Sequence, residues 1–81
     1  MSRRFYRART GRALADAVRG ARGSRGLTQT ELAEAIGSSR PTVSRIERGV
    51  PVAVDTVMAA LAECGYEIVV VPRGSVITVT S

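Results

Sequence analysis

Residues 27–49 read LTQTELAEAIGSSRPTVSRIERG, and this stretch decides the fold. Thr28 and Glu31 have the spacing of a capping box, in which each side chain accepts a hydrogen bond from the other residue's backbone N–H at the start of a helix. Gly37 can adopt the left-handed backbone conformation that ends a helix. The pattern therefore predicts a short helix that begins after Thr28 and ends at Gly37.

A second short helix is predicted directly after a tight turn. Either serine of the turn, Ser38 or Ser39, can cap it, and Pro41 falls in its first turn, where no backbone N–H is needed. Val43 and Ile46 are three residues apart and give this helix a buried face. Two short helices joined by such a turn form the helix-turn-helix motif.

Two longer helices are predicted on either side of this pair. The first covers residues 11–22 after a Thr10 cap, and its apolar face consists of Leu14, Val18 and Ala21. The second covers residues 54–64, and its apolar stripe consists of Val54, Val57, Met58 and Leu61. We interpret the single cysteine, Cys64, as a small core residue near a helix end, with redox sensing as the alternative.

The pattern changes period after Gly65. Residues 66–71 are rich in β-branched side chains, residues 76–80 alternate between apolar and polar, and turn-forming residues separate the two runs. This arrangement predicts a β-hairpin.

The first run of this tail is apolar on both faces, at Ile68, Val69, Val70 and Val71. Such a strand needs cover on both sides, and a two-stranded hairpin alone is marginal in water. A chain of 81 residues also buries only a small core. Pairing of two hairpins across a homodimer would meet all three needs; the alternative is a hairpin folded back on the helices of a monomer.

Charge is unevenly distributed along the chain. Twelve Arg and seven acidic residues, with no Lys or His, give a net charge of +5. Residues 1–26 carry +7, from eight Arg and one acid, whereas the remainder carries −2. The asymmetry indicates a polyanionic partner on the N-terminal side. The alternatives are a solvated basic tail and an amphipathic targeting peptide over residues 3–25.

Composition disfavours several function classes. With no His, one Cys and no paired-carboxylate or Gly-rich phosphate motif, we expect no catalytic site, no metal, no cofactor and therefore no enzyme. No apolar run approaches the ~20 residues that span a bilayer, so we expect a cytoplasmic protein without a membrane partner. Residues 38–49 hold three Arg and one acid, which disfavours a purely protein-binding module. RNA binding lacks its usual aromatic stacking platform.

The motif at residues 27–49 resembles the lambda-repressor-like, Xre-type helix-turn-helix family, and the resemblance extends over residues 11–65. It implies a mostly α fold of four to five helices, and double-stranded DNA as the partner. The tail is similar to that of HipB-type antitoxins, in which a C-terminal strand pairs with its twin across a dimer. Three parts are therefore expected: a basic arm (1–10), a helix-turn-helix domain (11–65) and a β-hairpin dimerisation tail (66–81).

The resemblance also implies a role for individual residues. The N-terminal and outward residues of the second short helix would contact DNA bases: Ser39, Arg40, Thr42, Ser44 and Arg45. The residues expected at backbone phosphates are Thr28, Gln29, Arg25 and Arg48. Alternatively, the Gln29 side chain could cap the first short helix. Arg40 and Arg45 could contact phosphate or remain solvated instead of contacting bases. Arg22 and Glu47 match a structural ion pair found in many relatives.

The arm has two readings. Its basic residues, Arg3, Arg4, Arg7 and Arg9, could reach a DNA groove or the adjacent backbone. Alternatively, Phe5 or Tyr6 could dock on the domain and leave the arginines solvated.

The expected function follows from the resemblance. The chain would be a sequence-specific repressor that binds an inverted-repeat operator as a homodimer, with half-sites about 34 Å apart. As a HipB-like antitoxin it would regulate its own operon and neutralise a HipA-like kinase toxin. The alternative is a stand-alone Xre-type repressor of phage or host genes without a toxin partner.

Overall fold

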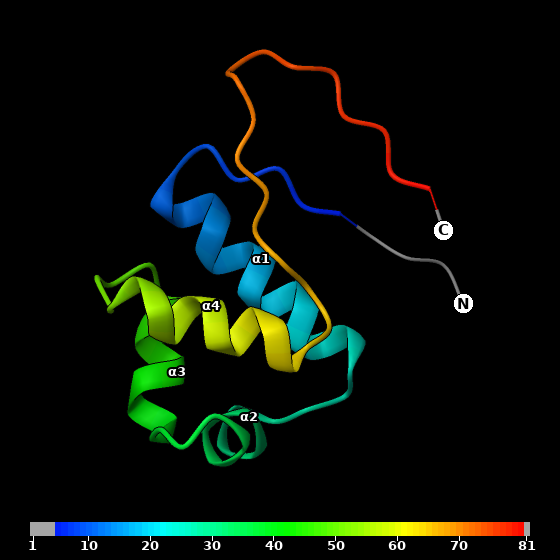
Figure 1. The fold of residues 1–81 in the computed structure, drawn as a ribbon. Coiled ribbons are helices and arrows are strands. Elements are labelled where there is room, and N and C mark those ends of the chain that lie inside the picture. Colours follow the sequence, from blue (N-terminus) through cyan, green and yellow to red (C-terminus); the bar gives the residue numbers. More distant parts are fainter. Residues whose placement is uncertain (1–4, 81) are drawn as a thin grey trace.

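The computed structural model describes residues 5–80, which form four helices. These are α1 (Gly11–Ser24), α2 (Gln29–Ala35), α3 (Arg40–Glu47) and α4 (Val54–Glu63) (Figure 1). All four predicted helices are present, and α1 extends slightly beyond its predicted end. None of the helices in the described part of the chain is long and apolar enough to cross a membrane.

The helix starts follow the capping signals in the sequence. The Thr10 side chain accepts from the backbone N–H of Ala13 at 3.1 Å at the start of α1. The capping box of α2 is complete: Glu31 N–H donates to the Thr28 hydroxyl at 3.0 Å, and Thr28 N–H donates to the Glu31 carboxylate at 2.9 Å. Ser39 caps α3. Because these bonds lie within one turn, the local sequence is enough to specify them.

One apolar core joins the four helices. It contains Val18, Ala21, Leu32, Ala33, Val43, Ile46, Val57, Ala60, Leu61 and Cys64. Burial raises the pKa of the Cys64 thiol and so favours its neutral form. The interpretation of Cys64 as a core residue is confirmed.

The predicted apolar stripe of α4 is partly wrong. Val54 and Met58 are exposed, at 70% and 49%, and the helix instead buries Val57, Ala60 and Leu61. Ala60 is completely buried, so the face of α4 that packs on the core includes a small side chain, while the larger Val54 and Met58 lie on the exposed side. A stripe judged by side-chain size alone misses such a contact.

The predicted β-hairpin is wrong for the single chain. Residues 66–80 contain a turn, in which Ser75 N–H donates to the Pro72 carbonyl at 3.1 Å, but no strand. Val70 and Val76 are 92% and 95% exposed. No second layer covers this tail within the described residues, and a hairpin without cover is marginal in water.

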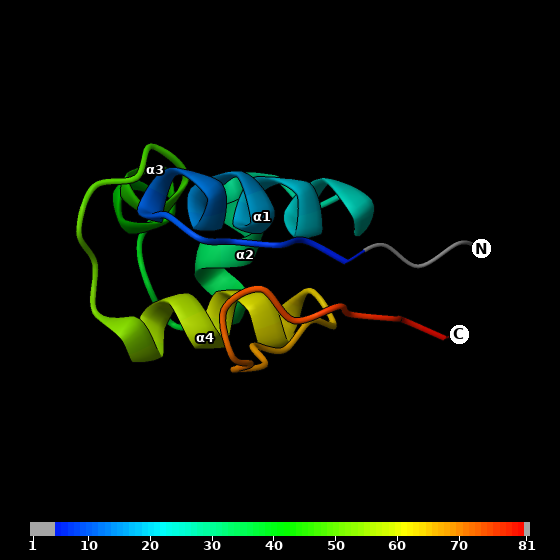
Figure 2. The ribbon, with the colours of Figure 1, turned by 90° about the horizontal axis from the view of Figure 1, so that it is seen from above.

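The N-terminal segment lies beside the tail. Tyr6 packs over Gly20 of α1, and its ring centroid is 5.8 Å from that of Tyr66. Arg7 donates to the Ser75 carbonyl at 2.7 Å. Both segments lie on the side of α1 and α4 that faces away from α2 (Figures 1 and 2).

Candidate nucleic-acid interface

Helix α3 divides its residues cleanly between the core and solvent. Val43, Ile46 and Glu47 are buried. The residues predicted to contact DNA lie on the other faces: Ser39, Arg40, Arg45 and Arg48 are exposed, and Thr42 and Ser44 are half-buried. The arrangement presents three guanidinium groups along one short helix.

The first turn of α3 is held by its own side chains. The Ser39 and Thr42 hydroxyls are 3.0 Å apart and hydrogen-bonded, and Thr42 N–H donates to the Ser39 hydroxyl at 3.4 Å. Ser39 is therefore the cap, and Arg40 is the first helical residue, followed by Pro41. The capping bonds use part of the capacity of both hydroxyls and leave the Arg40 side chain exposed to solvent.

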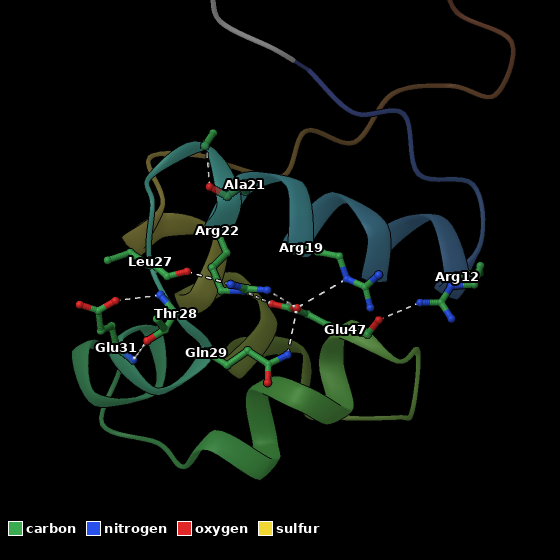
Figure 3. A network of polar contacts seen from close by, with 10 residues as sticks. Arg12, Arg19, Ala21, Arg22, Leu27, Thr28, Gln29, Glu31 and Glu47 are labelled. Atoms are coloured by element: carbon green, nitrogen blue, oxygen red, sulfur yellow. Dashed lines mark hydrogen bonds and ion pairs between the residues drawn. The ribbon is translucent and has the colours of Figure 1, made fainter.

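Glu47 connects α3 to α1 and α2 (Figure 3). Arg22 Nε donates to Glu47 Oε2 at 2.6 Å and Arg22 Nη2 donates to Oε1 at 2.9 Å, which makes a bidentate pair. Arg22 Nη1 also donates to the Leu27 carbonyl at 2.8 Å, just before α2. The ion pair expected between Arg22 and Glu47 is thus present, and it orients the two helices of the motif against α1.

The protonation states of this pair are tuned by their contacts. Burial alone would raise the pKa of Glu47, but hydrogen bonds from Arg22 and Gln29 and the positive charges of Arg22 and Arg19 outweigh it, so the net pKa is lowered. The hydrogen bond to Glu47 raises the pKa of Arg22. Both groups therefore remain charged near neutral pH.

Gln29 has a role that the sequence did not predict. Its side-chain amide donates to Glu47 Oε1 at 3.2 Å, whereas the cap of α2 is Thr28. Each amide nitrogen carries two N–H groups, so one remains for an external acceptor. Gln29 is half-buried, and its contact with Glu47 places it beside α3.

Arg25 is separated from the other predicted phosphate-binding residues. Its guanidinium lies beside Gly65, with Nη1 3.4 Å from the position that a Cβ on Gly65 would take. This places Arg25 at the C-terminal end of α4, where a cation is favoured by the helix dipole. The structure brings Thr28, Gln29 and Arg48 to the helix-turn-helix motif itself.

Two arginines of α1 belong to the site and were assigned no role from the sequence. Arg12 Nη2 donates to the Glu47 carbonyl at 2.7 Å, and Arg12 Nη1 donates to the Arg48 carbonyl at 3.4 Å, so Arg12 satisfies carbonyls at the C-terminal end of α3. Arg19 Nε lies 3.7 Å from Glu47 Oε1. The available signal was the spacing of Arg12, Asp16 and Arg19, which places all three on one helix face.

The described part of the arm, residues 5–10, is not brought to α3. Arg7 is bound to the Ser75 carbonyl, and Arg9 is exposed near the start of α1. Arg3 and Arg4 lie outside the described residues. The contacts of Tyr6 correspond to the docked reading of the arm.

Comparisons with known proteins agree with this geometry. Residues 18–71 match the HTH_3 family, described as helix-turn-helix. The structure is similar to HipB in a complex with an O4 20mer, at 26% identity and a TM-score of 0.77, over 85% of this chain and 99% of that one. It is also similar to a serine-to-alanine variant of HipB in a complex with an O2 20mer, at 25% identity and a TM-score of 0.78, over 86% and 99% of the two chains.

A search of curated proteins found no match. The family match covers two thirds of the sequence and contains both helices of the motif. The chain therefore belongs to the HTH_3 helix-turn-helix family, and its fold is of the HipB type.

Proposed function

We propose that this protein is a sequence-specific transcriptional repressor that binds double-stranded DNA as a homodimer, in the cytoplasm and on the nucleoid. The observation that carries the proposal is that Arg40, Arg45 and Arg48 of α3 are exposed to solvent while Glu47 of the same helix is buried and paired with Arg22. The similarity to HipB in complexes with 20mers supports it.

In this proposal α3 lies in the major groove and reads base edges. Arg45 and Arg40 would each donate two hydrogen bonds to guanine O6 and N7, the commonest specific contact between proteins and DNA. Thr42, Ser44 and Ser39 would contact neighbouring base edges from the same face. The anchored Glu47 keeps α3 from rotating, and this matters because bidentate contacts tolerate little misorientation.

Phosphate contacts would orient α3 on the duplex. Thr28 and Gln29 lie at the start of α2, and Arg48 follows the end of α3, so the three bracket the reading helix. Arg25 is more distant and would reach phosphates outside the central contact. Such contacts add affinity without sequence information.

The proposed dimer forms through the tail. Ile68, Val69, Val70 and Val71 are all exposed, a run of apolar side chains that is costly to leave in water. Pairing of this segment with the same segment of a second copy would satisfy its backbone and cover its side chains. The two α3 helices would then lie about one helical turn of DNA apart and require an inverted-repeat site.

We further propose that the chain is a HipB-like antitoxin, which represses its own operon and binds a HipA-like kinase toxin. The similarity to HipB supports this role. The alternative is a stand-alone Xre-type repressor, which shares the same DNA-binding face. Purification of the tagged chain expressed from its own locus separates the two: a kinase encoded beside it would co-purify with an antitoxin.

Arg45→Ala tests the reading role of α3. A duplex would first be selected from a random pool by the wild-type protein, and Kd would be measured on it and on a scrambled duplex of the same length. We expect loss of about 1–3 kcal/mol on the selected duplex and little loss on the scrambled one. Arg73→Ala removes the same charge from the tail and serves as the control. Equal loss on both duplexes would show a phosphate contact instead.

Val70→Asp tests the dimer. A charge in the middle of the proposed strand pair should give monomers in sedimentation velocity, because burying it unpaired is costly. Thr78→Asp, outside the proposed paired segment, is the control and should remain dimeric. A Val70→Asp protein that sediments as a dimer would contradict pairing through this segment.

A further inference from the structure

Arg19 of α1 makes few contacts within the fold. It lies beside Glu47, but Arg22 already occupies both carboxylate oxygens at 2.6 and 2.9 Å, and Gln29 adds a third hydrogen bond. The nearest approach of Arg19 is 3.7 Å, and its side chain is 60% exposed. The negative charge of Glu47 is therefore balanced without Arg19, whose positive charge is in excess at this surface.

The neighbouring arginine on the same face is in a different situation. Arg12 is engaged by the carbonyls of Glu47 and Arg48, and by Asp16 at 3.5 Å. Its role is to hold the C-terminal end of α3. Arg19 has no carbonyl and no second carboxylate among its contacts in the described chain. Of these two arginines, Arg19 is therefore the one whose guanidinium N–H groups can donate to a ligand.

Arg19 also lies next to a second donor. Arg19 Nε and Gln29 Nε2 lie 3.7 and 3.2 Å from the same atom, Glu47 Oε1, so a donor from α1 and a donor from α2 border one carboxylate. Figure 3 shows both side chains converging on Glu47 from either side. The exposed Arg19 guanidinium and the second N–H of the Gln29 amide can each donate to an oxygen of one tetrahedral anion placed beside this carboxylate.

We propose that Arg19 binds a backbone phosphate of the DNA beside each half-site, and that it shares this phosphate with Gln29. The inference rests on the proposed function. A phosphate, rather than a base, is the expected ligand because Arg19 is on α1, outside the reading helix, whereas the DNA backbone borders the groove that α3 occupies. The planar, permanently charged guanidinium suits phosphate oxygens. Residues on three helices would then contact one stretch of duplex.

The test is the salt dependence of binding to a 20-bp duplex that the wild-type protein selects from a random pool. In Arg19→Ala, the slope of log Kobs against log salt concentration should fall in magnitude by about 0.9 for each lost phosphate contact, or about twice that for a dimer. Affinity should decrease by a similar factor on selected and scrambled duplexes. Arg19→Lys, which keeps the charge, should retain most of the slope.

Two controls separate a contact from other effects. Arg73→Ala removes the same charge from the tail, so an equal fall in slope there would show a long-range field and overturn the proposal. The thermal melting curve of Arg19→Ala should match that of the wild type, because an exposed, distant ion pair adds little stability. An unstable variant with an unchanged slope would mean that Arg19 only supports Glu47. If the wild-type protein itself binds no duplex, the proposed function fails as well; if it binds and the Arg19→Ala slope is unchanged, only this inference fails.

Discussion

The helical domain and the tail are both rich in aliphatic residues, but the helical domain buries them and the tail leaves them exposed. In the helices, Leu32 and Val43 are completely buried. In the tail, Val70 and Val76 are almost completely exposed. Composition does not separate the two regions, so the difference must come from how each segment can satisfy its backbone and find cover.

A helix satisfies most of its backbone hydrogen bonds within itself, so four short amphipathic helices need only each other to close a core. A strand satisfies its backbone only by pairing with another strand, and a strand that is apolar on both faces needs two covering layers. One chain of this length supplies the first arrangement and not the second. The tail sequence is therefore compatible with the proposed dimer, whereas the helical sequence closes its core within one chain.

The largest effect is expected from breaking the polar centre of the helical domain. Glu47→Ala leaves the Arg22 guanidinium without its carboxylate in a mostly buried place, since the Arg22 side chain is 19% exposed. We expect a loss of about 3 kcal/mol in the free energy of unfolding, measured by urea denaturation. Glu34→Ala, an exposed acid on α2, should change it by less than about 0.5 kcal/mol. A loss as small for Glu47→Ala would mean that the pair does not hold the motif together.

Acidification should remove part of the same stabilisation. The pKa of Glu47 is lower in the folded chain than its usual value of 4.5, so its contribution is present above pH 4.5 and is lost as pH falls through the folded pKa. The pKa of Glu31 is lowered as well, by hydrogen bonds from the Thr28 backbone and side chain, and adds to the trend. Melting curves between about pH 6 and about pH 3, which bracket the usual carboxyl pKa, should show a weaker acid dependence in Glu47→Gln than in the wild type. Identical acid dependence would assign the effect to other groups.

A smaller effect is expected at the start of α2. Thr28→Ala removes the side-chain acceptor of the capping box and should reduce the free energy of unfolding by about 1 kcal/mol. Thr30→Ala is the matched control, because it makes the same change two residues later on an exposed face of α2, where no cap is involved. Equal losses in the two variants would show that the cap adds nothing specific.

The smallest effect on the monomer is expected in the tail. Val70→Asp should alter the free energy of unfolding of the dilute, monomeric chain by less than about 0.5 kcal/mol, since an exposed residue loses no packing. The same substitution should abolish the proposed dimer, so its effect on dimerisation would be much larger than its effect on the stability of the monomer. A large loss of monomer stability would show that the tail packs on its own helices, and the contrast between the two regions would disappear.

The sequence was sufficient for most of the fold. All four helices, the caps at Thr10 and Thr28, and the buried pair Val43 and Ile46 could be predicted, because each signal acts over one or two helical turns; the cap of α3 was narrowed to Ser38 or Ser39, and the structure has Ser39. The buried face of α4 could not be predicted, because the helix packs through Ala60 and leaves the larger Val54 and Met58 exposed. The hairpin was also mispredicted, since β-propensity describes how well a strand fits a sheet and does not supply the missing sheet.

The candidate site was predictable to a lesser extent. The outward placement of Arg40 and Arg45 follows from helix period, and the pairing of Arg22 with Glu47 followed from a family resemblance. Gln29 was assigned to phosphate, although within the chain it donates to Glu47. That contact joins residues 18 positions apart, so it is a product of packing between helices rather than of local sequence.

Caps and helix period act between near neighbours in the chain, so the sequence alone was enough to place the helix starts and to tell which face of α3 points to solvent. Which charges remain free depends on how the helices pack. The tertiary structure placed Arg12 on the carbonyls of Glu47 and Arg48, 35 and 36 residues away, and left Arg19 exposed beside a carboxylate that was already paired. The physical reason is that an ion pair depends on distance in space, and these distances exist only once α1 has packed against α3.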